Sequence, residues 1–330
     1  VLGTLMAVQP SVAQRDGADM KSEAAYQTRQ AFWIALALGV PYWFICYYSE
    51  PLLVAFRIDP SIVPDAAGYL RAISWGAPGL CLVLLLRYFS EGTGNTKPTM
   101  FYGVAGVLLN IPLNYVLMFG KLGFPALGTV GCGYATSIVI WLQFLFLLVY
   151  IATHRHYRPF SLLSRLEMPH MKTIISLLKL GLPIAVAIAV EGSLFVGAAL
   201  LIGQLGPVPA AAHLIAINFA ALMFMIPVGL SSAISIRVGN ALGRGEPEAA
   251  RYAGRIGLLI VFLFQTVSAT AMFLFPELIV RIYTDDVAVG TLAVSLLFYA
   301  AVFQYPDGVQ MVMAGALRGY KDTRMPMVYT

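Results

Sequence analysis

Residues 173–203 read TIISLLKLGLPIAVAIAVEGSLFVGAALLIG, a run in which Lys179 and Glu191 are the only ionisable side chains. A helix that crosses a bilayer requires about 20 consecutive, mostly apolar residues. Comparable stretches recur along the chain, at residues 30–55, 67–89, 99–119, 126–152, 208–236, 249–275 and 288–316, with a shorter one at 1–14 and another beginning near 326. The sequence therefore predicts an all-α polytopic membrane protein.

The composition supports this prediction and excludes other classes. The 330 residues are 59% hydrophobic and 11% charged, whereas soluble domains carry roughly 25% charged residues. A soluble protein of this size cannot bury so much apolar surface, which excludes a cytosolic enzyme. The sequence has no H-E-x-x-H, G-x-S-x-G or Walker A motif, and its three cysteines are isolated. We therefore expect neither an enzyme nor a bound metal cofactor.

The basic residues indicate how the chain is oriented. Of the 21 Lys and Arg residues, 16 fall in one alternating set of connections, and only Arg57, Lys121 and Arg281 fall in the other. Cytoplasmic connections carry an excess of Lys and Arg. The connections after residues 14, 89, 152, 236 and 316 are therefore predicted to be cytoplasmic. The formal charge of +5 then reflects orientation, and we expect no nucleic-acid partner.

The sequence also contains an internal repeat at an offset near 226. The clearest match aligns Glu91–Lys97 with Arg318–Arg324, which keeps Gly, Thr and a cation in register. Matching elements lie on the same predicted side, as in parallel repeats. We predict two pseudo-symmetric six-helix bundles, with lobes at 1–152 and 173–330 joined by a linker at 153–172. An intact protein would then have twelve helices, of which about nine are present, so the chain is predicted to be an internal fragment.

Two carboxylates in mid-span are the main candidates for function. Glu191 lies near the middle of its apolar run, and Asp307 follows Pro306 and precedes Gly308, which together predict a break in the helix. Ionisable groups inside a membrane are costly and mark pathways or relays. A paired carboxylate site could exchange a proton, a metal cation and a cationic substrate in competition. The alternative is that each carboxylate only forms a packing hydrogen bond to a neighbouring helix.

Other polar and soft residues are weaker candidates. Three of them could line a transport pathway, namely His213, Asn218 and Tyr305. For His213 and Asn218, hydrogen bonds between helices are the favoured explanation. Met223–Met225 fits an adaptable pocket or simple apolar packing. Arg87 and Glu91 are predicted to lie in a solvated loop.

Five segments carry a family resemblance. They are EGTGNTKPTMFYGVAGVLLNIPLNYVLMFG (91–120), LKLGLPIAVAIAVEGSLF (178–195), AAAHLIAINF (210–219), SIRVGNALGRGEPEAAR (235–251) and PDGVQMVMAGALRGYKDTRMPM (306–327). Together and in this order they resemble the NorM-like branch of the multidrug and toxic compound extrusion (MATE) family. On that reading the chain lacks the family's first helix, part of the second and the last two.

The resemblance implies twelve helices in two lobes around a central cleft, and export of cationic drugs against inward Na⁺ or H⁺. Glu191 and Asp307 match the family's acidic residues of the seventh and tenth helices, which belong to the cation site of the second lobe. Leu214 stands where many relatives have Gln, which leaves the substrate contacts of that helix open.

We therefore expect a cation-coupled antiporter that works by alternating access as a monomer, with cationic drugs or dyes and membrane lipids as its partners. No cofactor beyond the coupling ion is expected, and a bound Na⁺ would lie at Glu191 and Asp307. The alternative within transporters is a flippase for lipid-linked oligosaccharides. Such flippases use central cationic residues, and none is evident here.

Overall fold

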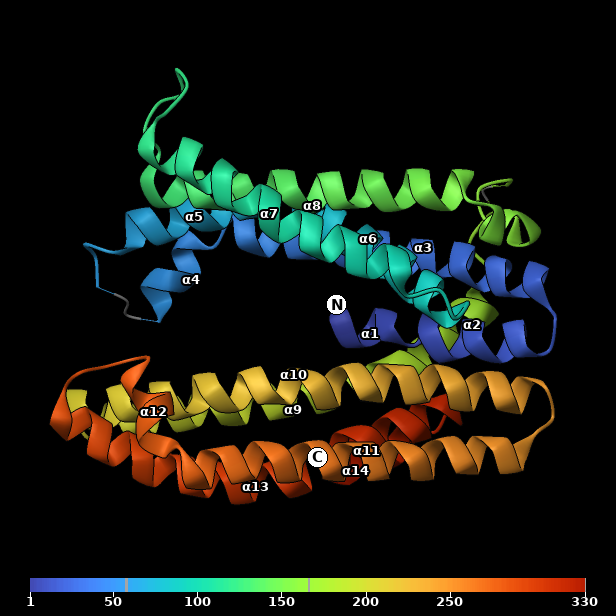
Figure 1. The fold of residues 1–330 in the computed structure, drawn as a ribbon. Coiled ribbons are helices and arrows are strands. Elements are labelled where there is room, and N and C mark those ends of the chain that lie inside the picture. Colours follow the sequence, from blue (N-terminus) through green and yellow to red (C-terminus); the bar gives the residue numbers. More distant parts are fainter. Residues whose placement is uncertain (57–58, 166, 330) are drawn as a thin grey trace. The chain divides into compact units, whose positions relative to one another are not determined.

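The computed structural model describes residues 1–56, 59–165 and 167–329, and this part of the chain is helical without any strand (Figure 1). Clustering by contacts divides the chain into two compact units, Val1–Leu182 and Pro183–Thr330. The boundary falls inside a helix, α9. The two lobes predicted from the internal repeat have their boundary earlier in the chain, in the linker at 153–172. That division stays a prediction.

The first unit contains eight α-helices and one 3₁₀ helix. They are α1 (Leu2–Met6), α2 (Val8–Gly17), α3 (Lys21–Tyr47), α4 (Glu50–Ala55), α5 (Val63–Ser74), α6 (Ala77–Gly92), α7 (Lys97–Phe119), α8 (Gly128–Thr153) and η1 (Arg155–Phe160). Helix α9 (Met171–Gly203) runs from this unit into the second. The remaining helices are α10 (Pro207–Gly243), α11 (Pro247–Leu274), α12 (Pro276–Arg281), α13 (Val287–Gly319) and α14 (Arg324–Tyr329).

Seven helices of the described chain are long and apolar enough to cross a membrane, namely α3, α7, α8, α9, α10, α11 and α13. Helices α5 and α6 form an eighth span if they are counted together, with a bend of 47° between them. This agrees with the eight complete spans expected from the sequence. The expected span at 67–89 is thus broken rather than straight, because Gly76 precedes α6 and Pro78 lies in its first turn.

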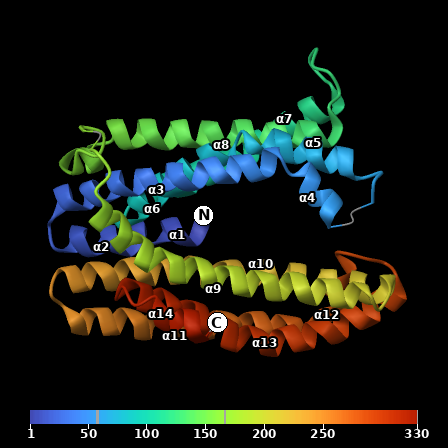
Figure 2. The same cartoon turned by 180° about the vertical axis from the view of Figure 1, so that it is seen from behind.

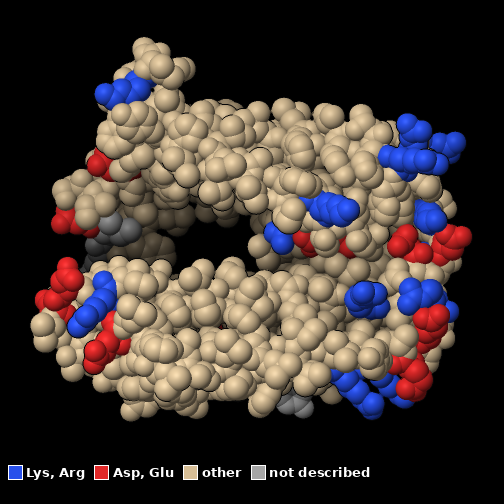
Figure 3. Space-filling model, viewed as in Figure 1, with Lys and Arg blue, Asp and Glu red and all other residues tan. Residues whose placement is uncertain are grey.

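The basic connections lie together within each unit. The α2–α3 and α6–α7 connections and the segment after α8 are at one end of the first unit in both ribbon views (Figures 1 and 2). On the face shown in Figure 3, most Lys and Arg side chains lie towards one end of each unit, and the surface along the long helices is largely uncharged. This is the distribution that the alternating charge pattern requires of membrane-spanning helices.

A buried polar cluster joins α2 and α6 in the first unit. Glu91 is 6% exposed, and its carboxylate accepts from the Gln9 amide at 2.8 Å and pairs with Arg87 at 2.7 Å. The prediction that Arg87 and Glu91 lie in a solvated loop was therefore wrong. A buried charge requires paired partners, and the partner Gln9 is distant in sequence.

The second unit contains a related arrangement at the position that the repeat predicts. Arg318, which aligns with Glu91, is 7% exposed and donates to the Ser231 hydroxyl at 2.6 Å. That hydroxyl in turn donates to the carbonyl of Met311 at 2.6 Å. A charged residue thus ties α13 to α10, as another ties α6 to α2.

Equivalent glycines permit both helix pairs to approach closely. A Cβ on Gly92 of α6 would lie 2.8 Å from Val12 Cβ and 2.9 Å from the Gln9 carbonyl of α2. A Cβ on Gly319 of α13 would lie 2.7 Å from Val238 Cβ and 2.9 Å from the Ser235 carbonyl of α10. Small residues of this kind hold membrane helices together, because lipid supplies little hydrophobic drive for their association.

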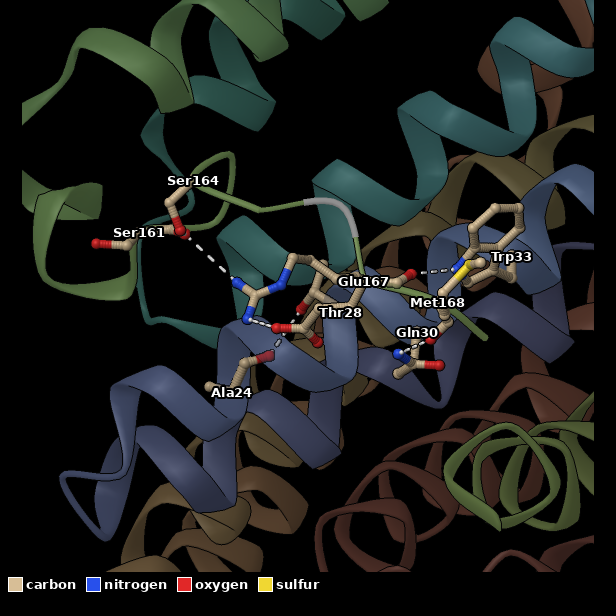
Figure 4. A network of polar contacts seen from close by, with 9 residues as sticks. Ala24, Thr28, Gln30, Trp33, Ser161, Ser164, Glu167 and Met168 are labelled. Atoms are coloured by element: carbon tan, nitrogen blue, oxygen red, sulfur yellow. Dashed lines mark hydrogen bonds and ion pairs between the residues drawn. The ribbon is translucent and has the colours of Figure 1, made fainter. Parts of the chain in front are cut away.

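The segment before α9 is fixed to α3 by an amide and an indole (Figure 4). Gln30 donates to the Met168 carbonyl at 3.0 Å and accepts from the His170 N–H at 2.7 Å. Trp33 donates its indole N–H to the Glu167 carbonyl at 2.9 Å. These bonds hold the approach to α9 against the first unit.

The 3₁₀ helix η1 is anchored by a buried tyrosine. The Tyr157 hydroxyl is hydrogen-bonded to the Ser90 hydroxyl of α6 at 2.6 Å. Burial raises the pKa of Tyr157 to about 12, so its hydroxyl keeps its proton throughout the physiological range. The linker is therefore tied to α6 as well as to α3.

The glycine contacts predict a test of fold stability. Gly92→Ala and Gly319→Ala each place a methyl group against backbone and Val atoms, and we expect a loss of about 1–3 kcal/mol, measured as a lower thermal midpoint of the detergent-purified protein. Gly229→Ala in α10 is the matched control, because nothing lies within 4 Å of a Cβ there. Equal midpoints for all three variants would contradict the close approach.

Candidate functional site

A pocket of about 440 Å³ lies within the second unit. Its wall is formed mainly by α10 and α13, with Gln265 from α11 and Phe195 from α9. The residues that line it are Phe195, His213, Ala216, Ile217, Ala220, Ala221, Met223, Phe224, Gln265, Leu296, Tyr299, Ala300, Phe303, Gln304 and Asp307. The lining is mostly apolar and aromatic, and Asp307 is its one acidic residue.

Two buried amides accompany Asp307. Gln265 is 3% exposed and Gln304 is 9% exposed. The Gln304 amide N–H donates to the backbone carbonyls of Gln265 at 3.4 Å and Ala301 at 3.3 Å, which fixes its orientation. The pocket thus has a small polar region, made of one carboxylate and two amides, in an otherwise apolar wall.

The side-chain oxygen of Gln265 is buried and has no hydrogen-bond partner in the structure. An unsatisfied acceptor in a low-dielectric setting costs about 1–3 kcal/mol, so it favours a donor or cation nearby. Gly308 admits the Gln265 side chain, since a Cβ there would overlap the amide nitrogen. Sequence reasoning missed Gln265, although an amide within an apolar span was a signal that could have found it.

Glu191 lies on α9 and is partly buried. It is within electrostatic range of Asp307 and of Arg318, but it is not among the residues that line the pocket. The structure thus brings the two sequence-predicted carboxylates near each other within the second unit. Two like charges in an apolar setting repel, and a bound cation or proton relieves that repulsion.

The weaker candidates separate into two groups. His213, Met223 and Phe224 line the pocket. Asn218 is exposed and donates to the Leu214 carbonyl of its own helix at 2.9 Å.

Tyr305 also lies outside the pocket lining. Its hydroxyl contacts that of Thr266 at 3.3 Å, and its ring packs on Phe262 of α11. In the structure it therefore links α13 to α11.

The helix break predicted at Pro306 and Gly308 is not present, because α13 is continuous from Val287 to Gly319. Proline is tolerated inside a membrane helix where neighbouring helices support the freed carbonyl. Helix α13 has such support, since Leu297 and Ala301 on one side and Val312 and Ala316 on the other are buried in apolar clusters with α10 and α11.

A metal site rich in side-chain ligands is not found. Within the described residues no group of three or more His, Cys, Asp or Glu side chains could hold a metal ion. A cation at Asp307 and Glu191 would thus complete its shell with amide or backbone oxygens. The unpaired side-chain oxygen of Gln265, which lines the same pocket as Asp307, is one such ligand. Hard cations such as Na⁺ prefer oxygen ligands.

Comparison with known proteins decides the family. The family model MatE matches residues 1–116 and 183–330, which include the pocket and both carboxylates. The chain belongs to the MatE family. The resemblance seen in the five sequence segments is thereby confirmed, and the family places this chain among membrane transporters rather than enzymes.

Bacterial relatives of the MatE chain match along nearly its whole length. This chain is 46% identical over 326 residues to the "Probable multidrug resistance protein NorM" of Xanthomonas axonopodis pv. citri. The aligned region covers 99% of this chain and 71% of the relative. The chain is 42% identical over 333 residues to the "Multidrug resistance protein PmpM" of Pseudomonas aeruginosa, covering 99% and 69%.

Solved structures share the MatE fold. A crystal structure of MATE in the bent conformation superposes with a TM-score of 0.88 at 20% identity, covering 99% of this chain and 72% of the other. An outward-facing multidrug resistance MATE transporter gives 0.87 at 22% identity, covering 99% and 72%. At these identities the likeness establishes the fold alone.

The pocket predicts a pattern of thiol reactivity on α13. In a variant without Cys46, Cys81 and Cys132, we expect Ala300→Cys to react with a cationic methanethiosulfonate reagent, because Ala300 lines the pocket and a thiolate forms only where water reaches it. Ala301→Cys is the control, since Ala301 is fully buried. Labelling is measured by mass spectrometry, and a cysteine at position 300 that reacts no faster than one at position 301 would contradict a pocket open to solvent.

Proposed function

We propose that the chain is a multidrug efflux transporter that exports cationic, amphipathic compounds in exchange for Na⁺ or H⁺ by alternating access. The observation that carries the proposal is the pocket of the second unit, which combines an apolar, aromatic wall with a single carboxylate, that of Asp307. Multidrug resistance proteins are also the named relatives at more than 40% identity.

The pocket suits a cation with a broad apolar body. Phe195, Phe224, Tyr299 and Phe303 supply aromatic surface, and aromatic faces attract cations. Lys and Arg are absent from its lining, so nothing described there repels a positive charge. Few polar groups in the lining can fix the orientation of a bound molecule, so the pocket favours a range of substrates rather than a single one.

Coupling follows from the position of Asp307, which both lines the pocket and interacts electrostatically with Glu191. An ion or proton bound by these carboxylates removes the negative charge that a cationic substrate needs. The ion and the substrate then compete for one site. Transport results if the ion has different affinities for the inward-open and outward-open states.

The setting is a bacterial inner membrane, where we propose that the protein works as a monomer in contact with lipid and without a nucleic-acid partner. The bacterial sources of the relatives and the alternating basic connections support this setting. A flippase for lipid-linked oligosaccharides is not favoured, because the pocket lining offers no Lys or Arg for a pyrophosphate group.

Neutral isosteres test the coupling site. In cells that express the protein, Glu191→Gln and Asp307→Asn should reduce efflux of a cationic dye by more than about tenfold, since losing one charge-assisted contact costs roughly 1.5–3 kcal/mol. Efflux is followed by dye fluorescence, with Na⁺ and pH gradients imposed separately. Glu248→Gln is the matched control, because Glu248 is exposed and pairs only with Arg251 on its own helix.

Undiminished ion-driven efflux in both carboxylate variants would refute the assignment of Glu191 and Asp307. A dye flux that follows the Na⁺ gradient at constant pH identifies Na⁺ as the coupling ion, and one that follows only the pH gradient identifies H⁺.

A further inference from the structure

A second pocket, of about 170 Å³, lies within the first unit and plays no part in the proposed transport site. It is bounded by α3, α6, α8 and the segment that follows η1. Its wall is apolar, with Phe32, Leu86 and Phe144 among the residues that form it. Arg29 and Arg165 are its only charged lining residues. An apolar cavity with two cationic side chains matches a molecule that has a hydrocarbon part and an anionic group.

Arg29 has one hydrogen-bond donor without a partner in this wall. Its guanidinium pairs with Glu167 at 2.8 Å and donates to the Ser161 carbonyl at 3.4 Å. Its Nε–H, however, is buried without a hydrogen-bond partner. Because Nε is also closed to solvent, a ligand in the pocket would meet the positive charge of the guanidinium, which the Glu167 carboxylate partly offsets.

Arg165 and Leu163 place the mouth of the pocket at the surface. Both are exposed, and Leu163 is 53% exposed. Exposed apolar side chains of α8, Leu145 and Phe146, belong to the same unit. A surface of this composition suits lipid better than water.

The pocket also lies at the basic end of the first unit. The segment after η1, which contributes Arg165, is at the end where the α2–α3 and α6–α7 connections lie (Figures 1 and 2). This is the end that the charge pattern predicts to be cytoplasmic. The cytoplasmic leaflet carries anionic lipids, and basic pockets between helices on that side bind their headgroups.

We propose that this pocket binds an anionic phospholipid of the cytoplasmic leaflet. Part of one acyl chain lies against Phe32, Leu86 and Phe144, and the phosphate lies near the positive charges of Arg165 and Arg29. The volume of the pocket accommodates several methylene groups and not a whole lipid, so the rest of the molecule stays in the bilayer. The bound lipid would join α3, α6 and α8 to the segment that leads into α9.

Lipid titration of the purified protein tests this proposal. Phosphatidylglycerol added to the detergent-solubilised protein should bind more tightly than phosphatidylcholine, as measured by native mass spectrometry and by the shift in thermal midpoint. Arg165→Gln should weaken phosphatidylglycerol binding by about tenfold, the worth of one charge-assisted contact. Arg155→Gln is the matched control, because Arg155 is an exposed linker arginine outside the pocket lining.

A second variant keeps the test independent of Arg165. Leu163→Glu changes an exposed position at the mouth, so the fold is retained while the new carboxylate repels the phosphate, and binding should again fall. Equal binding of the two lipids, or equal losses for Arg165→Gln and Arg155→Gln, would overturn the proposal. A stabilisation reproduced by inorganic phosphate alone would likewise overturn it, because the hydrocarbon part would then contribute nothing.

Discussion

The structure depends on how closely its helices can approach one another. Inside a bilayer an apolar side chain is as stable against lipid as against a neighbouring helix, so packing distance and polar contacts decide which helices associate. In this chain the contacts are made at glycines and at buried polar groups. Gly92 admits Val12 of α2, and Gly319 admits Val238 of α10. A side chain larger than hydrogen at either glycine would separate the helices and weaken the polar bonds beside them.

The same constraint explains why charged residues survive in the interior. Glu91 and Arg318 occupy equivalent places in the repeat, and each bonds to a neighbouring helix of its own unit. Their charges are opposite, so the repeat has kept the position of a polar contact and not its chemistry. A buried charge bonded to a neighbouring helix restricts the register of the two helices, because a shift along the helix would leave that charge unpaired. The arrangement of the pocket follows from that register.

The sequence was sufficient for the spans and the family, because each rests on patterns spread over many residues. Hydrophobic length identified the seven long spans and the bent α5–α6 pair, and an offset of 227 residues aligns Gly92 with Gly319, which make similar close contacts. The sequence was insufficient for residues whose environment is set by partners far away along the chain. Glu91 was misread as solvated because Gln9 lies 82 positions away, and no local rule shows that contact. Pro306 was expected to break α13, but the apolar clusters on both sides keep the helix continuous.

Helix α9 passes from the first unit into the second. His170, directly before its first turn, is bound to Gln30 of α3, and its later turns carry Glu191 in the second unit. Helical backbone is stiff along its axis, so a displacement at its start reaches Glu191 undiminished unless the helix bends. Pro183, the first residue of the second unit, lacks an N–H and removes one backbone bond there. Bending of α9 is therefore easiest near Pro183, and it would move Glu191, on which ion binding is proposed to depend, relative to the first turns of the same helix.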